Sequence, residues 1–425
     1  MNRIKFIGIR EKTAILTVWW SLVSAGCIQP DVIKLQLSDQ NSKPKNGTEG
    51  GGPGNNSSGG SGSNLHPLYP SLDLAALPNG GGGELGPFQV SELPRISRSV
   101  TLSSRFDIER ECARSGGGLE INVPAGTVLD QLTLSGQTDC RFVFGDGSVV
   151  RGALRIDNNN FTQNPGIPSR IEVINLRVEG MILIGGRQEG NGATDIVLRR
   201  IVGASFDMNQ INRLTILDST FITGGGGPII NGDNVAVLNT NIFTSDPNHH
   251  NSWAFRTTVG NNIIIKDSTF ASGRHKVIRM AQTNYFFVEN VVMMREQFGL
   301  NDFFATVGAA SLPFIDQNYT YFRNCEMITI HDGGAALIGP HPALDTIERF
   351  WQMENIHFIA KTEDTISSDM ISHVQNLCQP EENCDLRPQS HRFTYTRNER
   401  MTLPNDRWRR TAAGADLIPR FAQSQ

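Results

Sequence analysis

Two arginines, Arg256 and Arg279, hold equivalent positions in a repeated segment of this 425-residue chain. Each lies eleven residues before a polar residue, Asp267 or Asn290, within the same apolar phrase. If the segments stack, the guanidinium groups lie about 5 Å apart and repel by about 3 kcal/mol at an effective dielectric near 20. An anion between them removes that repulsion, and guanidinium groups bind carboxylate or sulfate in bidentate fashion. The pair therefore indicates an anion-binding clamp.

The anion itself is left open by the sequence. It is either a fixed carboxylate, such as Asp246 or Glu296, or a carboxylate or sulfate of a bound ligand. A further alternative is an ordinary pair of surface arginines that are splayed apart or paired elsewhere. Acidic polysaccharides supply ligand carboxylates, and they are the partner that we expect.

Cleavage of such a polysaccharide by β-elimination needs a neutralised uronate carboxylate and a base near the C5 proton. The two arginines meet the first need, and His275 or Lys276 meets the second. Side chains two residues apart point to the same side of a strand, so His275 shares the outward phase of Arg279 and is favoured. His249 and His250, from the neighbouring segment, are alternative bases.

The expected ligand-contacting residues gather in loops that leave one edge of the repeat. The predicted substrate-binding set is Arg256, Arg279, His249, His250, Trp253 and Arg274, and the predicted catalytic set is His275 and Lys276. No histidine or cysteine cluster has metal-ligand spacing, so we predict no metal site. The sequence assigns no cofactor.

A short sequence pattern, repeated eight times, must position these residues. Apolar residues stand four and two positions before a polar residue, and apolar or small residues one and three after it. Period-two alternation marks a strand with one buried face, and the change of phase needs a one-residue bend that Asn and Asp tolerate in the left-handed conformation. One coil of a solenoid per bend is predicted. The bends are Asn175, Arg200, Asp218, Asn239, Asp267, Asn290, Asn324 and Asn355.

Phrases such as L-T-I-L-D-S-T-F (214–221) and V-A-V-L-N-T-N-I (235–242) resemble the right-handed parallel β-helix superfamily, to which pectate-lyase-like proteins belong. The resemblance spans roughly residues 115–365. It implies an all-β, right-handed parallel β-helix solenoid of about ten coils with stacked asparagines. The fold implies no single activity, because it hosts lyases, hydrolases, adhesins and passive scaffolds. The lyase signatures of the superfamily are absent, and Asn234 stands where its pectin hydrolases have an aspartate.

The first 26 residues have a basic start and a short apolar run, as in an export signal. Ser24-Ala25-Gly26-Cys27 resembles the cleavage box of bacterial lipoproteins, which implies lipidation at Cys27 and an outer-membrane location. A simple secreted protein is the alternative. The formal charge of −4 argues against a nucleic-acid partner.

The remaining chain divides by composition. Residues 27–99 are rich in Gly, Ser and Asn and are predicted to form a flexible tether. We place the β-helix at 100–365, opening with a short capping helix near residues 106–114, because a parallel β-helix exposes unpaired strand edges at both ends. Residues 366–425 are predicted to be the C-terminal capping segment.

The cysteines fit an oxidising compartment. Cys112 and Cys140 are about one coil apart, and Cys378 and Cys384 close a small loop, so each pair is a candidate disulfide. Cys325 takes an inward position and is expected to be a buried thiol.

Together these features predict an exported, membrane-tethered β-helix protein that binds an acidic polysaccharide. Cleavage by β-elimination is one version of this hypothesis. The alternative is a non-catalytic glycan-binding, adhesive or structural protein of the cell surface. The sequence does not set the oligomeric state.

Overall fold

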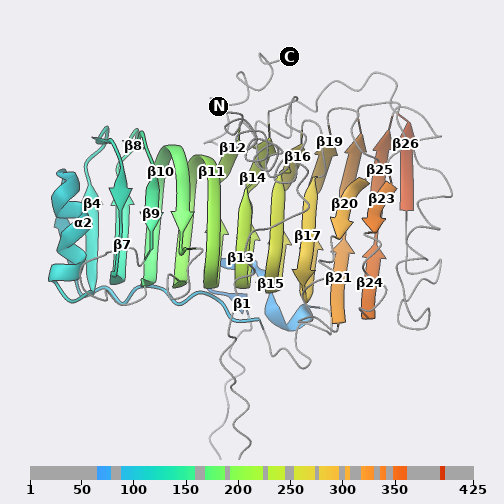
Figure 1. Cartoon of the computed structure of the whole chain (residues 1–425), viewed down its shortest axis with the longest axis horizontal. Helices are drawn as coiled ribbons and strands as arrows, with labels where there is room; N and C mark the ends of the chain where they lie inside the picture. Colours follow the sequence, from blue (N-terminus) through green and yellow to red (C-terminus); the bar gives the residue numbers. More distant parts are fainter. Residues whose placement is uncertain are drawn as a thin grey trace, which may run out of the picture. The chain divides into compact units, whose positions relative to one another are not determined.

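The structure is a computed structural model of a parallel β-solenoid with about seven turns, and its described residues contain one α-helix. Successive coils stack through parallel strand pairs, so each strand pairs with its equivalent in the next coil (Figure 1). The predicted all-β parallel solenoid is confirmed, whereas the count of ten coils stays a prediction. The described residues are 65–77, 88–157, 168–186, 192–223, 228–244, 253–272, 277–295, 302–306, 317–329, 336–340, 348–360 and 393–397.

The elements follow one another as a nearly unbroken series of strands. The helices are η1 (Leu74–Ala76, a 3-10 turn) and α2 (Arg105–Arg114). The strands are β1 (Leu65–His66), β2 (Tyr69–Asp73), β3 (Arg98–Thr101), β4 (Leu119–Val123), β5 (Val128–Leu129), β6 (Leu132–Thr133), β7 (Thr138–Phe144), β8 (Val149–Val150), β9 (Leu154–Ile156), β10 (Ser169–Ile184), β11 (Ala193–Leu217), β12 (Thr220–Thr223), β13 (Ile229–Leu238), β14 (Asn241–Thr244), β15 (Phe255–Lys266), β16 (Thr269–Ser272), β17 (Ile278–Thr283), β18 (Tyr285–Glu289), β19 (Val292–Arg295), β20 (Asp302–Thr306), β21 (Gln317–Arg323), β22 (Glu326–Thr329), β23 (Ala336–Pro340), β24 (Glu348–Glu354), β25 (Ile356–Ala360) and β26 (Phe393–Arg397).

The bends lie where the repeat predicts them. All eight bend residues have positive φ, between 44° and 61°. Their side chains bond along the stack, as Asn239 Nδ2 donates to Asp218 Oδ1 at 2.6 Å and Asn355 Nδ2 donates to Asn324 Oδ1 at 2.8 Å. The bend therefore needs a residue that tolerates the left-handed region and an amide that bridges coils.

This requirement predicts different costs for two substitutions at Asn175, which has φ 61° and whose Nδ2 donates to Phe144 O at 2.9 Å. Asn175→Ala loses the bond and strains the backbone, so it should lower the free energy of unfolding by about 2 kcal/mol. Asn175→Gly loses the bond without the strain and should lower it by about half as much. Urea titrations followed by circular dichroism measure both, and equal losses would argue against left-handed strain at the bend.

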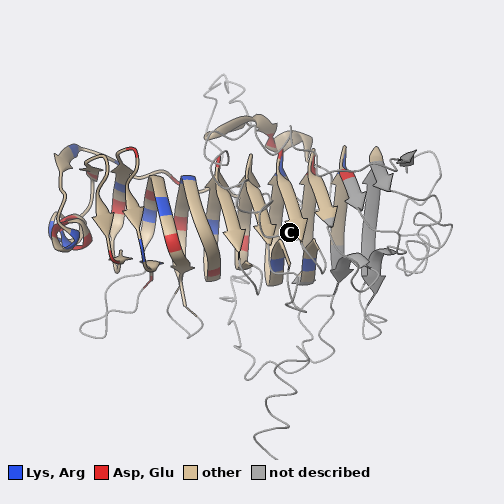
Figure 2. Ribbon diagram, turned by 90° about the horizontal axis from the view of Figure 1, so that it is seen from above, with Lys and Arg blue, Asp and Glu red and all other residues tan. Residues whose placement is uncertain are grey.

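A second column of left-handed residues, which the sequence analysis missed, makes another corner of each coil. Its φ values lie between 51° and 62°. The members in consecutive coils are Asp139, Arg170, Asp195, Arg213, Asn234 and Asn262. Here basic and acidic residues alternate, and Figure 2 shows blue and red bands on neighbouring strands in the half of the solenoid nearer α2.

The charges of this column hold one another in bidentate pairs. Arg170 donates to both carboxylate oxygens of Asp139 at 2.6 and 2.7 Å, and Arg213 donates to both oxygens of Asp195 at 2.5 and 2.7 Å. The hydrogen bonds from Arg170 hold the pKa of Asp139 below its usual value. Both carboxylates are therefore held in place by an arginine of the neighbouring coil.

Two stretches inside the predicted tether pack on the outside of the solenoid. Residues 65–77 form a small hairpin and η1, and residues 88–97 run across successive strands as an extended strap (light blue in Figure 1). The sheet surface beneath them carries an outer apolar cluster that includes Leu72 of the hairpin. The sheet residues of this cluster are Leu217, Ala236, Leu238, Ile264, Tyr285 and Phe287. The Gly, Ser and Asn content of 27–99 as a whole conceals this docking, because the apolar residues that carry it are confined to 68–77 and Phe88.

His66 sits in this hairpin with only 1% of its surface exposed, and its Nδ1 accepts the Leu68 N–H at 3.2 Å. Burial disfavours the imidazolium ion and lowers the His66 pKa to about 4. The unfolded chain, with a pKa near 6.5, binds the proton first, so stability is lost as pH falls from about 6.5 to 4. The total loss is about 3 kcal/mol.

We therefore expect the hairpin to become protease-sensitive between pH 6.5 and 4 while it stays protected at pH 7. A His66→Gln variant removes the titration and should show little change over this range. Proteolysis by an acid-tolerant protease at a series of pH values measures both proteins. An identical pH dependence in the variant would assign the effect to other groups.

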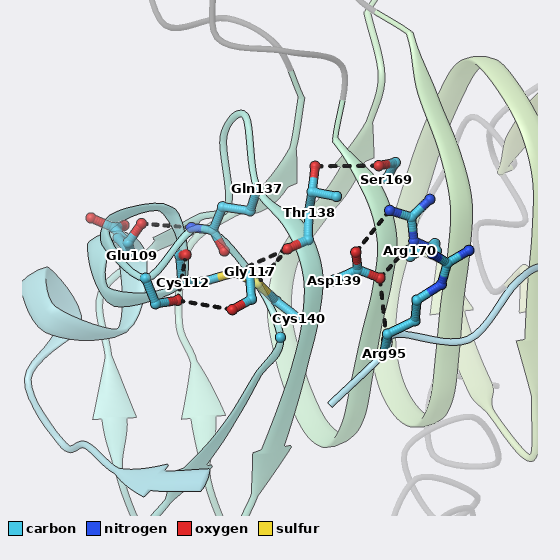
Figure 3. Close-up of a disulfide and its surroundings, with 12 residues drawn as sticks. Arg95, Glu109, Cys112, Gly117, Gln137, Thr138, Asp139, Cys140, Ser169 and Arg170 are labelled. Atoms are coloured by element: carbon cyan, nitrogen blue, oxygen red, sulfur yellow. Dashed lines mark hydrogen bonds and ion pairs between the residues drawn. A yellow bond between two sulfur atoms is a disulfide. The ribbon is translucent and has the colours of Figure 1, made fainter. Parts of the chain in front are cut away.

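Helix α2 forms where predicted and buries Ile108 and Cys112 against the core. Cys112 and Cys140 are joined by a disulfide with a Cα–Cα distance of 6.2 Å, which links α2 to β7 (Figure 3). Whether α2 protects the strand edge as a cap stays a prediction. Cys325 is a buried free thiol as predicted, and burial raises its pKa to about 12.

Several predicted features lie outside the described residues. These are the signal peptide 1–26, Cys27, the tether up to residue 64 and the Cys378–Cys384 pair. Within the predicted C-terminal segment 366–425, β26 is described, and it pairs in parallel with β25. Parallel pairing thus continues past residue 365.

Candidate anion-binding site

Strand pairing brings the two arginines of the predicted clamp together. β15 and β17 pair in parallel with Arg256 directly opposite Arg279, so the predicted register is confirmed. Ile229 precedes the pair in the same column, and Ala305 and Gly339 follow it in the next two coils. In the column, the arginine pair is therefore preceded by an isoleucine and followed by two residues of small type.

Trp253 lies beside both guanidinium groups. The Cζ atoms of Arg256 and Arg279 are 5.0 and 4.8 Å from its ring centroid. The electron-rich ring attracts both cations, at about 0.5–2 kcal/mol for each contact. One indole thus offsets part of the like-charge repulsion, which is an explanation that the sequence analysis did not consider.

Trp253, which we predicted to contact a ligand, is 4% exposed, and its ligand contact stays a prediction. A sugar ring needs an open aromatic face for stacking, and this face is directed at the arginines. The Trp253 carbonyl accepts a hydrogen bond from Thr244 Oγ1 at 2.6 Å, and Ala254 N–H donates to Val277 O at 3.1 Å. The backbone of Trp253 is therefore fixed beside the two arginines.

Polar side chains fill the neighbouring column on the same side of the sheet. Asn231 Nδ2 donates to Asn209 Oδ1 at 2.7 Å, and Asn231 Oδ1 accepts the Thr258 N–H at 2.9 Å. Thr258 follows Arg256 by two residues, so its side chain is on the same side of β15. These groups satisfy one another, so the column fixes the backbone beside the arginines.

The other predicted site residues lie outside the described residues. These are His249, His250, Arg274, His275 and Lys276, together with the fixed carboxylates considered above, Asp246 and Glu296. The structure thus brings together three of the predicted residues, Arg256, Arg279 and Trp253. The choice between a fixed and a ligand carboxylate stays open, as does the identity of a base.

Elsewhere, a concavity of about 330 Å³ lies along the bend ladder, lined by Asp267, Ser268, Thr269, Asn290, Val291, Val292, Asn324 and Glu326. Neither arginine lines it. In the described part of the chain, no three His, Cys, Asp or Glu residues are grouped to hold a metal ion. No helix among the described residues is long and apolar enough to span a bilayer.

No family model, curated protein or solved structure matches this chain. The resemblance to pectate-lyase-like proteins is therefore one of repeat pattern, and the structure supports its coarser part, the parallel β-solenoid. Function has to be argued from the site.

Proposed function

We propose that this protein is an exported, membrane-tethered solenoid that binds an acidic polysaccharide through Arg256 and Arg279. The observation that carries the proposal is their direct pairing on adjacent strands beside one tryptophan. Two guanidinium groups at one coil spacing offer parallel N–H donors to a carboxylate or sulfate.

The export signal and lipidation at Cys27 are the other half of the proposal. Their support is the basic and apolar start of the chain and the Ser24-Ala25-Gly26-Cys27 box. A protein placed at the outer membrane meets acidic polysaccharides outside the cell. Metabolic labelling with a fatty acid, compared between the full chain and Cys27→Ala, tests the anchor separately from binding.

Binding is tested with two polysaccharides of one backbone, one bearing carboxylates and the other with those groups reduced to alcohols. We expect the carboxylated form to bind and the affinity to fall as salt rises from 50 to 500 mM, because salt screens exposed charges. The reduced form should bind at least about tenfold more weakly, the loss expected for one charge-assisted hydrogen bond. Equal binding of both forms would contradict recognition of the anion.

Cleavage by β-elimination is the version of this function that needs His275, Lys276 or a neighbouring histidine as base. Products of a lyase carry an unsaturated uronate that absorbs ultraviolet light. Absorbance that appears with the full chain and is lost in His275→Ala would establish a lyase. Binding without absorbance, over a panel of alginates, pectins and glycosaminoglycans, would instead establish a non-catalytic glycan-binding protein.

A further inference from the structure

The strap, residues 88–97, shows a three-residue periodicity. Ser91 and Pro94 are buried, with Ser91 3% exposed, and Phe88 packs against the outer apolar cluster. The residues that follow each of these are exposed. Three residues per turn is the repeat of the polyproline II conformation, and proline in this stretch favours it. The strap thus turns every third side chain toward the sheet.

Its backbone donors follow the same period. The N–H of Gln89 donates to Asn234 Oδ1 at 3.0 Å, and that of Glu92 donates to Asp195 Oδ1 at 2.8 Å. The N–H of Arg95 donates to Asp139 Oδ1 at 3.2 Å, and Figure 3 shows this carboxylate held between Arg95 and Arg170. The backbone N–H of every third strap residue therefore donates to a side-chain oxygen of the second left-handed column.

The acceptors are spaced to suit this repeat. Asp139, Asp195 and Asn234 lie two coils apart, because Arg170 and Arg213 occupy the coils between them. Two strand spacings measure about 9.6 Å. One polyproline II turn of three residues measures about 9.3 Å. The alternation of acceptor and arginine along the column thus matches the strap's pitch.

We propose that this column is a docking track for a polyproline II segment, and that residues 88–97 occupy it as a strap that can leave as one unit. The acceptors of the track bind backbone N–H groups of the docked segment. Their spacing therefore sets the register of that segment on the column. Arg170 and Arg213 keep the acceptor carboxylates in place. The strands beneath pair with one another from β4 to β13, so their ladder does not require the strap. Release of the strap and hairpin would expose an apolar sheet surface.

Two substitutions of one type test the track in the full chain. Asn234 and Asn175 have φ 57° and 61°, so glycine fits both positions without backbone strain. Asn234→Gly removes a strap acceptor. Asn175→Gly, on the bend ladder, loses bonds to Phe144 O and Asp146 Oδ1 only, leaves the three strap acceptors in place and is the matched control.

Hydrogen exchange of the strap amides is the readout. Loss of one hydrogen bond should speed exchange by about tenfold. If the strap docks as a unit, Asn234→Gly speeds exchange at Gln89, Glu92 and Arg95 together, while Asn175→Gly speeds none of them. Faster exchange at Gln89 alone, or an equal effect of the control, would overturn the proposal.

Wild-type protein provides a second measurement that does not depend on the variants folding. In low denaturant, the three strap amides should converge on one opening that is at least about tenfold more frequent than the opening of the β13 amides. Strap amides that exchange only together with β13 would show that strap and solenoid open as one body. That result would overturn the proposal.

Discussion

Alanine at Phe286 should destabilise the solenoid, whereas alanine at the adjacent Phe287 should mainly release the hairpin. Both side chains are buried, with 0% and 1% exposed. They lie on opposite sides of β18. Phe286 belongs to the inner core, with ring centroids 6.3 and 6.4 Å from those of Phe255 and Phe322, and Phe287 belongs to the outer cluster under the hairpin.

Removing a buried phenylalanine side chain costs about 3–5 kcal/mol. In Phe286→Ala this cost falls on the stacked coils, so the main thermal transition should move down by several degrees. In Phe287→Ala it falls on hairpin docking, so residues 65–77 should become sensitive to protease while the main transition moves less. Calorimetry and limited proteolysis of both variants measure the difference. Equal shifts of the main transition would mean that hairpin and solenoid unfold as one unit.

Replacing both clamp arginines by glutamine should weaken binding of an acidic polysaccharide by about 100-fold or more. A hydrogen bond to a charged group contributes about 1.5–3 kcal/mol, and two such groups are lost. Arg256→Lys with Arg279→Lys keeps both charges without the planar fork, so we expect an intermediate loss. Titration calorimetry with one polysaccharide preparation measures the affinities.

Arg155→Gln is the matched control for the clamp. Arg155 occupies the same column of the sheet several coils earlier, where its neighbours are Thr133 and Leu183. Its side chain is exposed and lies 4.0 Å from Asp157. Loss of this one exposed arginine should leave the affinity within about twofold, as for other exposed surface charges. A similar loss in Arg155→Gln would assign binding to general positive charge and not to the clamp.

The sequence predicts this fold well because its repeat encodes geometry directly. The phase change at each bend requires left-handed backbone, and the eight residues chosen on that ground all have it, Arg200 included. The same count put Arg256 opposite Arg279, which strand pairing confirms. The pairing register of the strands follows from the two-residue alternation of their buried side chains, and this alternation can be recognised in the sequence.

Other parts of the site and surface are less legible. The second left-handed column includes Arg170 and Arg213, and arginine is not a residue type that indicates positive φ. The sequence does not indicate the strap, because the N–H groups that bond the column are present in almost any sequence. The burial of Trp253 follows from three-dimensional packing, and the expected bases stand in loops outside the described residues. The three-residue spacing of Phe88, Ser91 and Pro94 is the one signal that could have found the strap.

A crystal structure of the full chain with a short acidic oligosaccharide tests the clamp most directly. Our account predicts a sugar carboxylate or sulfate within hydrogen-bonding distance of the guanidinium groups of both Arg256 and Arg279, with Trp253 still against the arginines. A protein carboxylate such as Asp246 or Glu296 between the arginines, with the oligosaccharide bound elsewhere, would contradict it.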